Sequence, residues 1–130
     1  EKNNTDCINC SNDLDWKFIA TVKKSVEDNM DNPSFNVDVL CNLLNMSRTS
    51  FYNKIKALTD QAPADYIRLI RLKHAAQLLK EQKHTITEIS ELTGFSDAKY
   101  FREVFKKHFN MSPSQYAKRG KEGKDDKEIK

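Results

Sequence analysis

The fold is decided by the stretch Val37-Asp38-Val39-Leu40-Cys41-Asn42-Leu43-Leu44-Asn45-Met46-Ser47, because its pattern occurs twice in the chain. The apolar residues at every third position return 49 residues later, again followed by a serine, as Ile86, Ile89, Leu92, Phe95 and Ser96. After one extra residue in the second copy the offset becomes 50, and Phe51, Ile55, Pro63 and Tyr66 return as Phe101, Phe105, Pro113 and Tyr116. A repeat of this length indicates one supersecondary unit built twice.

Each copy predicts a short amphipathic helix, a tight turn and a second helix of about three turns, which is the pattern of a helix-turn-helix. In this motif the second helix lies in the major groove of DNA. Asn36 is the predicted cap of the first short helix, and Ser47 and Ser96 are the predicted caps of the two second helices.

Residues suited to turns stand at two pairs of equivalent positions. Asn45 and Gly94 occupy the turns, and both residue types readily adopt positive φ. Asp60 and Asn110 each stand three residues before a proline, where they can end the second helices in a left-handed conformation. This agreement predicts the same backbone path in both copies.

The segment before the first copy predicts one further helix. Asp13 or Asp15 can cap it, and a single apolar stripe follows at helical spacing, formed by Phe18, Ile19, Val22, Val26 and Met30. A helix with only one apolar stripe must pack on a neighbour, and the first helix-turn-helix is the nearest.

Between the copies, residues 64–82 predict a helix of about 28 Å. This length is close to the roughly 34 Å of one DNA turn. The sequence thus predicts an all-α, homeodomain-like fold of about seven helices, in which two helix-turn-helix subdomains are joined by a long linker helix. The predicted parts are a flexible linker (1–12), the first subdomain with its N-terminal helix (13–62), the connecting helix (63–82), the second subdomain (83–119) and a disordered tail (120–130).

Composition and charge limit the classes of function. The chain is 38% hydrophobic and 32% charged, which is typical of a globular domain. No run approaches the roughly 20 apolar residues of a membrane span, and from the polar N-terminus we expect no signal peptide. It begins at Glu1 without methionine, so we expect it to be part of a longer protein. Residues 36–119 hold 14 Lys and Arg against 8 Asp and Glu, a net charge of +6. This basic excess suits a polyanionic partner.

The three cysteines carry no predicted chemistry. Cys7 and Cys10 supply only half of the ligands of a tetrahedral zinc site, and no histidine pair completes it. We therefore expect two free thiols in a flexible linker. Cys41 stands beside Leu40 and is expected to pack in the core.

Taken together, these residues resemble the DNA-binding domain of AraC/XylS-type transcription regulators over about residues 15–118. The matching pieces are Pro63-x-x-Tyr66-Ile67, Arg71-Leu72-x-x-Ala75-Ala76-x-Leu78-Leu79, Ile86-x-x-Ile89, Gly94-Phe95, Phe101-x-x-x-Phe105-Lys106-Lys107 and Ser112-Pro113-x-x-Tyr116. The first half looks most like the C-terminal domain of hybrid two-component regulators of gut bacteria, through Asn32-Pro33-x-Phe35, Met46-Ser47-Arg48, Phe51-Tyr52, Lys56-Ala57-Leu58-Thr59 and Ile70-Arg71-Leu72-Lys73. The resemblance implies an upstream sensor, histidine kinase and receiver.

Helix geometry selects the residues that face DNA. Phe51, Ile55 and Leu58 must face the core in the first copy, as must their counterparts at 101, 105 and 109 in the second. The N-terminal half of a recognition helix meets base edges. The predicted base-contacting residues are therefore Thr49, Tyr52, Asn53, Ala98, Lys99, Arg102 and Glu103.

Side-chain chemistry assigns roles to these residues. Asn53 can pair with adenine, Arg102 or Lys99 with guanine, and Glu103 can accept from cytosine. The basic side chains predicted to hold phosphates are Arg48, Lys54, Lys56, Arg68, Lys106 and Lys107. In the family, the position two residues after the buried aromatic is often arginine, whereas here it is Asn53 and Glu103. For every outward residue the alternative is a solvated helix surface, and for Glu103 it is an ion pair with a neighbouring cation.

Other conspicuous side chains are predicted to be structural. Arg71 is expected to satisfy carbonyls at a helix end. Aromatic residues at core spacing are expected to pack rather than to stack on bases: Trp16, Phe51, Tyr66, Phe95, Phe101, Phe105, Phe109 and Tyr116.

The leading function is sequence-specific binding of double-stranded DNA by a transcription regulator, with the two recognition helices in successive major grooves. The alternative is a helical protein-interaction module without sequence-specific readout. No catalytic triad, metalloprotease motif or phosphate loop indicates an enzyme, although a histidine kinase is expected upstream. We expect no metal, cofactor or small-molecule ligand and no membrane contact in this fragment. We also expect a cytoplasmic domain that is monomeric in isolation, within a full-length protein that is dimeric and anchored in the inner membrane.

Overall fold

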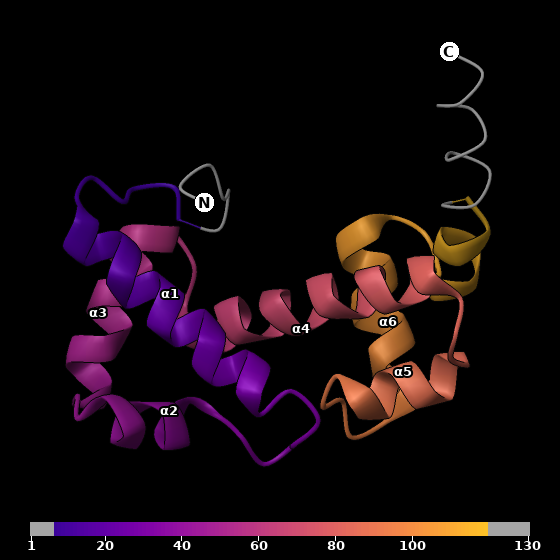
Figure 1. The fold of residues 1–130 in the computed structure, drawn as a ribbon, viewed down its shortest axis with the longest axis horizontal. Coiled ribbons are helices and arrows are strands. Elements are labelled where there is room, and N and C mark those ends of the chain that lie inside the picture. The colour runs from indigo at the N-terminus through magenta and orange to yellow at the C-terminus, as the bar shows by residue number, and fades with distance from the viewer. Residues whose placement is uncertain (1–6, 120–130) are drawn as a thin grey trace. The chain divides into compact units, whose positions relative to one another are not determined.

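The computed structural model describes residues 7–119, which contain helices and no β-strand. The labelled helices in Figure 1 are α1 (Asp13–Asp28), α2 (Val37–Leu44), α3 (Arg48–Thr59), α4 (Pro63–Glu81), α5 (Ile86–Leu92) and α6 (Ala98–Phe109). A further helical segment covers residues 113–119. The predicted all-α fold is confirmed, whereas the first half of the predicted linker (1–6) and the predicted tail (120–130) lie outside the described residues. No helix of residues 7–119 is long and apolar enough to span a membrane.

The chain forms two compact units. Of the described residues, unit 1 comprises 7–30 and 34–71, and unit 2 comprises 31–33 and 72–119. The boundary falls inside α4, between Arg71 and Leu72. The first half of this helix therefore belongs to unit 1, and the second half belongs to unit 2.

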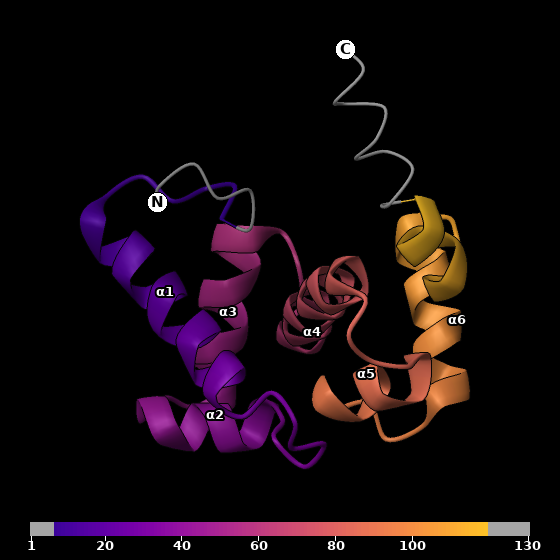
Figure 2. The same cartoon turned by 45° about the vertical axis from the view of Figure 1, so that its right-hand side comes forward.

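Helix α1 lines one wall of the unit 1 core, beside α3 and with α2 at one end of both (Figure 2). Its N-cap is Asn12, whose side-chain oxygen accepts a hydrogen bond from the backbone N–H of Asp15 at 2.9 Å. The expected cap at Asp13 or Asp15 is wrong, because both residues already lie in the first helical turn. The predicted apolar stripe is confirmed, since its central members are buried: Ile19, Val22 and Val26.

Helix α2 is capped by Asn36, which accepts from the backbone N–H of Val39 at 3.1 Å, as predicted. Leu40 is fully buried, but Leu43 is 58% exposed although it belongs to the repeated three-residue pattern. Three residues rotate a helix by about 300°, so each step falls about 60° short of a full turn. The pattern therefore drifts off the buried face, and the equivalent Leu92 of α5 is also exposed.

The turn between α2 and α3 and the end of α3 follow the predicted backbone path. Asn45 is left-handed with φ 55°, and the Ser47 hydroxyl caps α3 by accepting from the N–H of Ser50 at 3.1 Å. Asp60 ends α3 with φ 62°, and its N–H donates to the Lys56 carbonyl at 2.9 Å.

Arg71 is a buried charge within unit 1, only 6% exposed. Its guanidinium donates to the Met30 carbonyl at 2.6 Å and to the Phe35 carbonyl at 3.2 Å, both in the segment after α1. Burial lowers the pKa of the guanidinium below its ordinary value. The predicted structural role is confirmed, because these carbonyls replace part of the water that the charge has lost.

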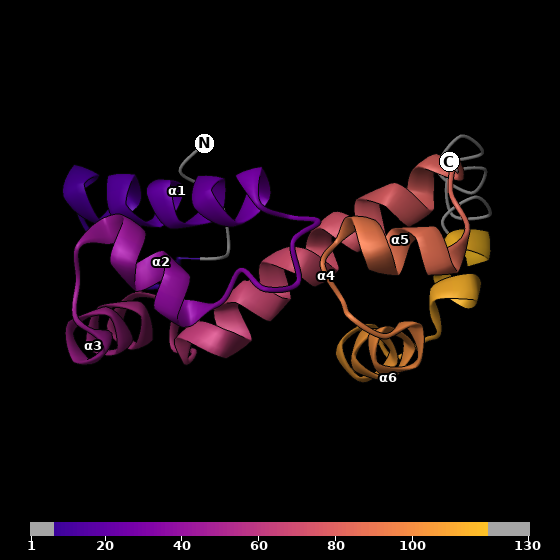
Figure 3. The same cartoon turned by 90° about the horizontal axis from the view of Figure 1, so that it is seen from below.

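Unit 2 repeats the motif around an aromatic core. Thr85 and Glu88 form a capping box at the start of α5, and Gly94 takes φ 80° in the turn, as predicted. Figure 3 shows α5 and α6 with the segment 113–119 near α6. Ring centroids lie 4.4 to 5.7 Å apart in neighbouring pairs among Phe95, Phe101, Phe105, Phe109 and Tyr116.

The N-cap of α6 is Asp97, whose carboxylate accepts from the backbone N–H of Lys99 at 2.9 Å. The expected cap at Ser96 is wrong by one residue. Asp97 lies 50 residues after Ser47. The extra residue of the second copy therefore lies in the turn, before the cap of α6. Asn110 then ends α6 with φ 63°, like Asp60 in α3.

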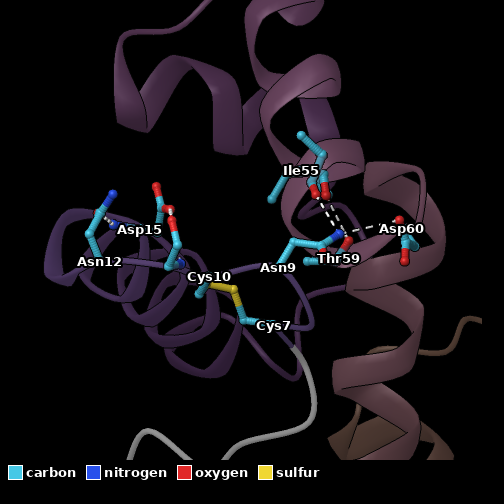
Figure 4. The surroundings of a disulfide bond; sticks show 10 residues. Cys7, Asn9, Cys10, Asn12, Asp15, Ile55, Thr59 and Asp60 are labelled. Carbon is cyan, nitrogen blue, oxygen red and sulfur yellow. Dashed lines mark hydrogen bonds between the residues drawn. A yellow bond between two sulfur atoms is a disulfide. The ribbon is translucent and has the colours of Figure 1, made fainter.

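The described part of the N-terminal segment packs on unit 1 (Figure 4). Cys7 and Cys10 form a disulfide with their Cα atoms 5.6 Å apart, and Cys7 is buried in the unit 1 core. The expectation of two free thiols is therefore wrong, because it weighed Cys7 and Cys10 as metal ligands and not as partners in an internal crosslink. Cys41 is buried, as expected.

Candidate nucleic-acid interface

Helix α3 separates its core side from its outward side at helical spacing. Phe51, Ile55 and Leu58 are buried. The predicted base-contacting residues of this helix are exposed on the opposite side: Thr49, Tyr52 and Asn53. Because Ser47 caps the helix immediately before them, they occupy its first two turns, the part of a recognition helix that reaches bases.

Helix α6 shows the same division in unit 2. Phe101 and Phe105 are fully buried, and the outward residues Lys99, Arg102 and Glu103 are exposed. Ala98 is only half-buried and opens the helix. The two units thus each present one polar helix face, but the chemistry differs, because α6 carries charges where α3 carries neutral groups.

The predicted phosphate-contacting residues divide into two groups. Lys56, Lys106 and Lys107 are exposed and make no ion pair within residues 7–119. Arg48 pairs with Asp38, and Arg68 pairs with Asp65 at 2.5 Å. Lys54 lies over the Phe18 ring, with its ammonium 4.8 Å from the ring centroid. The structure therefore gives three of these six cations a partner inside unit 1.

A hollow of about 380 Å³ lies at the outward face of α3. Its wall includes Arg48, Thr49, Tyr52 and Asn53 from α3, Val37 at the start of α2, and residues 62–64 at the start of α4. The lining thus combines neutral polar side chains and one guanidinium with apolar residues, all within unit 1. The three predicted base-contacting residues of α3 are brought together at this single surface.

Sequence reasoning missed one exposed aromatic on α6. Tyr100 is 43% exposed, and its ring centroid is 6.2 Å from that of Phe95. It precedes the buried Phe101 by one residue, a rotation of about 100° around the helix. That rotation is the signal that could have found it, because it places Tyr100 at the edge of the outward face beside Lys99.

Known proteins of related sequence and structure supply an independent comparison. Residues 40–119 match the family described as Helix-turn-helix domain. Histidine kinase P4 of Formosa agariphila is 46% identical over 106 residues, which cover 82% of this chain and 8% of that protein. The chain spans only 8% to 38% of the length of the curated relatives it matches.

Solved structures also resemble the chain. The C-terminal domain of the two-component response regulator yesN from Fusobacterium nucleatum is 27% identical, with a TM-score of 0.70 over 78% of this chain and 98% of that chain. The DNA-binding domain of AdpA, a global transcriptional factor solved with a target DNA, is 26% identical. Its TM-score is 0.69 over 75% of this chain and 87% of that chain.

Proposed function

The chain belongs to the AraC/XylS-type helix-turn-helix family, and we propose that it is the sequence-specific, double-stranded DNA-binding domain of a transcription regulator. The observation that carries the proposal is the duplicated recognition helix. Both α3 and α6 bury one face and expose polar or basic side chains at equivalent positions of the other. A helix that served only to pack would not need such an outward face twice.

We assign base contacts to the first two turns of each recognition helix. In α3, Thr49, Tyr52 and Asn53 border one hollow, and the Asn53 amide matches the donor and acceptor edge of adenine. In α6, Lys99 and Arg102 match the acceptors of guanine, while Glu103 matches the cytosine amine. Ala98 has no polar group, so we assign it an apolar contact, for which the thymine methyl is suited.

Phosphate contacts complete the proposed interface. Lys56, Lys106 and Lys107 are available without breaking an ion pair. Arg48 and Arg68 pair with exposed or half-exposed carboxylates, and such pairs contribute only about 0–1 kcal/mol. Each guanidinium can therefore turn to a phosphate at little cost. Lys54 can reach a phosphate only by leaving the Phe18 ring. The free energy lost with such a contact is about 0.5–1 kcal/mol, similar to that of the ion pairs.

The proposal extends to the longer protein. We propose that α3 and α6 enter successive major grooves, that a histidine kinase and receiver precede this domain, and that the full-length protein is dimeric. Similarity to histidine kinase P4 and to the C-terminal domain of a response regulator supports the two-component part. We further propose that this domain acts in the cytoplasm while the full-length protein is anchored in the inner membrane.

Selection from random duplexes of about 30 base pairs tests the proposal, since two half-sites one turn apart need roughly 10–10.5 base pairs between centres. Two enriched blocks at that spacing are the expected result. A single block would mean that only one unit reads bases. No enrichment from a folded protein would contradict sequence-specific binding.

The dependence of affinity on salt concentration distinguishes DNA binding from the alternative function, a helical protein-interaction module. If the basic residues contact phosphates, log affinity should fall by about 0.9 per contact for each log unit of salt. Binding to a protein partner would show a much shallower dependence, because it releases no condensed counterions.

A further inference from the structure

The disulfide ring of residues 7–10 touches the end of the first recognition helix. Asn9, inside the ring, donates its backbone N–H to the Leu58 carbonyl at 3.0 Å. Its side-chain amide donates to the Ala57 carbonyl at 2.9 Å and approaches an Asp60 carboxylate oxygen at 3.5 Å. Figure 4 shows Asn9 directed toward the end of α3, with the disulfide on the other side of the loop.

These contacts are a C-terminal cap supplied from another part of the chain. The last four carbonyls of a helix have no partner within the helix. In α3, the Lys56 carbonyl accepts from the backbone N–H of Asp60. The Ala57 carbonyl accepts from the side-chain amide of Asn9, and the Leu58 carbonyl accepts from the backbone N–H of Asn9. One residue of the ring therefore satisfies two of the four carbonyls at the end of α3.

The other side of the ring is fixed to the start of α1. The backbone N–H of Ser11 donates to the Asp15 carboxylate at 3.3 Å, and the adjacent Asn12 is the cap of α1. Cys7 is 5% exposed and belongs to the unit 1 core, and Cys10 is partly buried against the same core. The ring thus ties α1 to α3 within unit 1.

We propose that Cys7 and Cys10 form a thiol–disulfide exchange site whose oxidation state sets the stability of the C-terminal end of α3. The co-reactant is a dithiol reductant. Its thiolate attacks the sulfur of Cys10, the more exposed of the pair, and the Cys7 sulfur leaves as a thiolate that takes up a proton. The second thiol of the reductant then attacks the mixed disulfide and releases Cys10 as a thiol. The chain gains two electrons and two protons, and the reductant becomes a disulfide.

Reduction acts on the cap because the ring restricts the backbone of Asn9. Opening the ring returns conformational freedom to residues 7–10, and the two hydrogen bonds of Asn9 must then order a looser segment. Intracellular disulfides are rare and are commonly redox-sensing, which fits a crosslink in a DNA-binding domain. Cys41 does not take part in the exchange, since it is buried and burial raises the pKa of its thiol.

The chemistry is tested by counting thiols in the 130-residue chain. Alkylation with iodoacetamide in denaturant should modify one cysteine of the oxidised chain and three after treatment with dithiothreitol. Three modified cysteines after incubation with oxidised glutathione would overturn the proposal, because no ring would then form.

Amide hydrogen exchange tests the cap. The N–H of Asn9 should exchange about tenfold faster in the reduced chain, and the amides of the last turn of α3 should follow. The double variant Cys7→Ser with Cys10→Ser should exchange like the reduced chain under both conditions. Two matched controls should keep the full redox response: Ile8→Ala, an exposed residue inside the ring, and Cys41→Ala. Equal exchange at Asn9 in the oxidised and reduced chains would overturn the proposal.

A final measurement, which rests on the proposed function, concerns DNA. Affinity for the duplex selected above should be about two- to fivefold lower in the reduced chain, because a frayed α3 reduces the binding-competent fraction. Equal affinity would overturn control of DNA binding by this site. If neither state binds DNA, the proposed function fails, while hydrogen exchange still decides the redox proposal.

Discussion

The two units contain the same helix-turn-helix but close it against different helices. In unit 1 the wall behind the motif is α1, which contributes aliphatic side chains. In unit 2 the second half of α4 supplies buried residues instead, and its Ala75 and Leu79 lie 49 residues after Val26 of α1 and Met30, which follows α1. All four are buried. The repeat therefore extends beyond the motif, and the linker helix is also the first helix of the second copy.

The units also differ in how they satisfy helix ends. Ser112 opens the segment 113–119 with a capping box, since it exchanges hydrogen bonds with Gln115 at 3.0 and 3.2 Å. The equivalent residue before α4 is Ala62, which has no side chain that can cap. Conversely, the end of α3 is held by Asn9 from the N-terminal segment. The left-handed turn and helix-end positions recur in both units, but the groups that satisfy the helix ends come from different places.

The largest expected effect separates the two cores. Phe101→Ala should destabilise unit 2 by about 3–5 kcal/mol, because a fully buried ring leaves a cavity. Trp16, the single tryptophan, packs on the unit 1 core, so its fluorescence reports unit 1 alone. Urea titration should show an early loss of helix by circular dichroism and an unchanged tryptophan transition. A tryptophan transition that shifts equally would show that the units unfold together. Phe51→Ala should give the reverse pattern.

The next effect belongs to unit 1 alone. Arg71→Met should cost roughly 2–4 kcal/mol, because it leaves the Met30 and Phe35 carbonyls unsatisfied in the core. The matched control is Lys17→Met, an exposed position on α1 of the same unit, which should change stability by less than about 0.5 kcal/mol. If urea titration gives the same loss of unfolding free energy for both variants, the hydrogen bonds of Arg71 do not stabilise unit 1 as proposed.

The recognition helices should then differ in what they read. Asn53→Ala and Arg102→Ala should each cost about 1–3 kcal/mol on the selected duplex and relax preference at one base pair, in different half-sites. Lys106→Ala should weaken binding to all sequences alike and reduce the salt slope by about 1. If all three variants weaken every duplex equally, the assignment of base contacts is wrong.

The smallest effect exchanges the caps between the units. Ser112→Ala should destabilise unit 2 by about 0.5–2 kcal/mol, and Ala62→Ser should stabilise unit 1 by a similar or smaller amount. Thermal unfolding followed by circular dichroism reports both units, and Trp16 fluorescence reports unit 1, so the two probes together assign each change in Tm to its unit. A stabilisation of unit 1 by Ala62→Ser with loss of DNA affinity would show that the open hollow at the start of α4 matters for binding.

Much of the fold could be predicted from the chain because the motif is local. Helical periodicity identified the buried faces of α3 and α6, and the residues Asn45, Asp60, Gly94 and Asn110 marked left-handed positions that few other residues tolerate. The caps at Asp97 and Asn12 were missed because several suitable residues stand side by side. Which of these neighbouring residues becomes the cap depends on the residue at which the helix begins.

The candidate site was predictable only in part. Exposure of the outward residues follows from helix geometry, so Thr49, Asn53, Lys99 and Arg102 lie where the sequence placed them. Their partners do not follow, because an ion pair such as Arg48 with Asp38 joins two helices. Contact of these residues with bases and phosphates remains a prediction.

The sequence alone determined the repeated helix-turn-helix, since its periodicity, caps and turn residues act within a few residues along the chain. Tertiary structure decided which distant groups satisfy the ends and the buried charge. Asn9 reaches Leu58, and Arg71 reaches Met30, across separations of about 40 to 50 residues. Hydrogen bonds of this kind depend on where the packed helices place each carbonyl, and no local pattern in the sequence encodes that position.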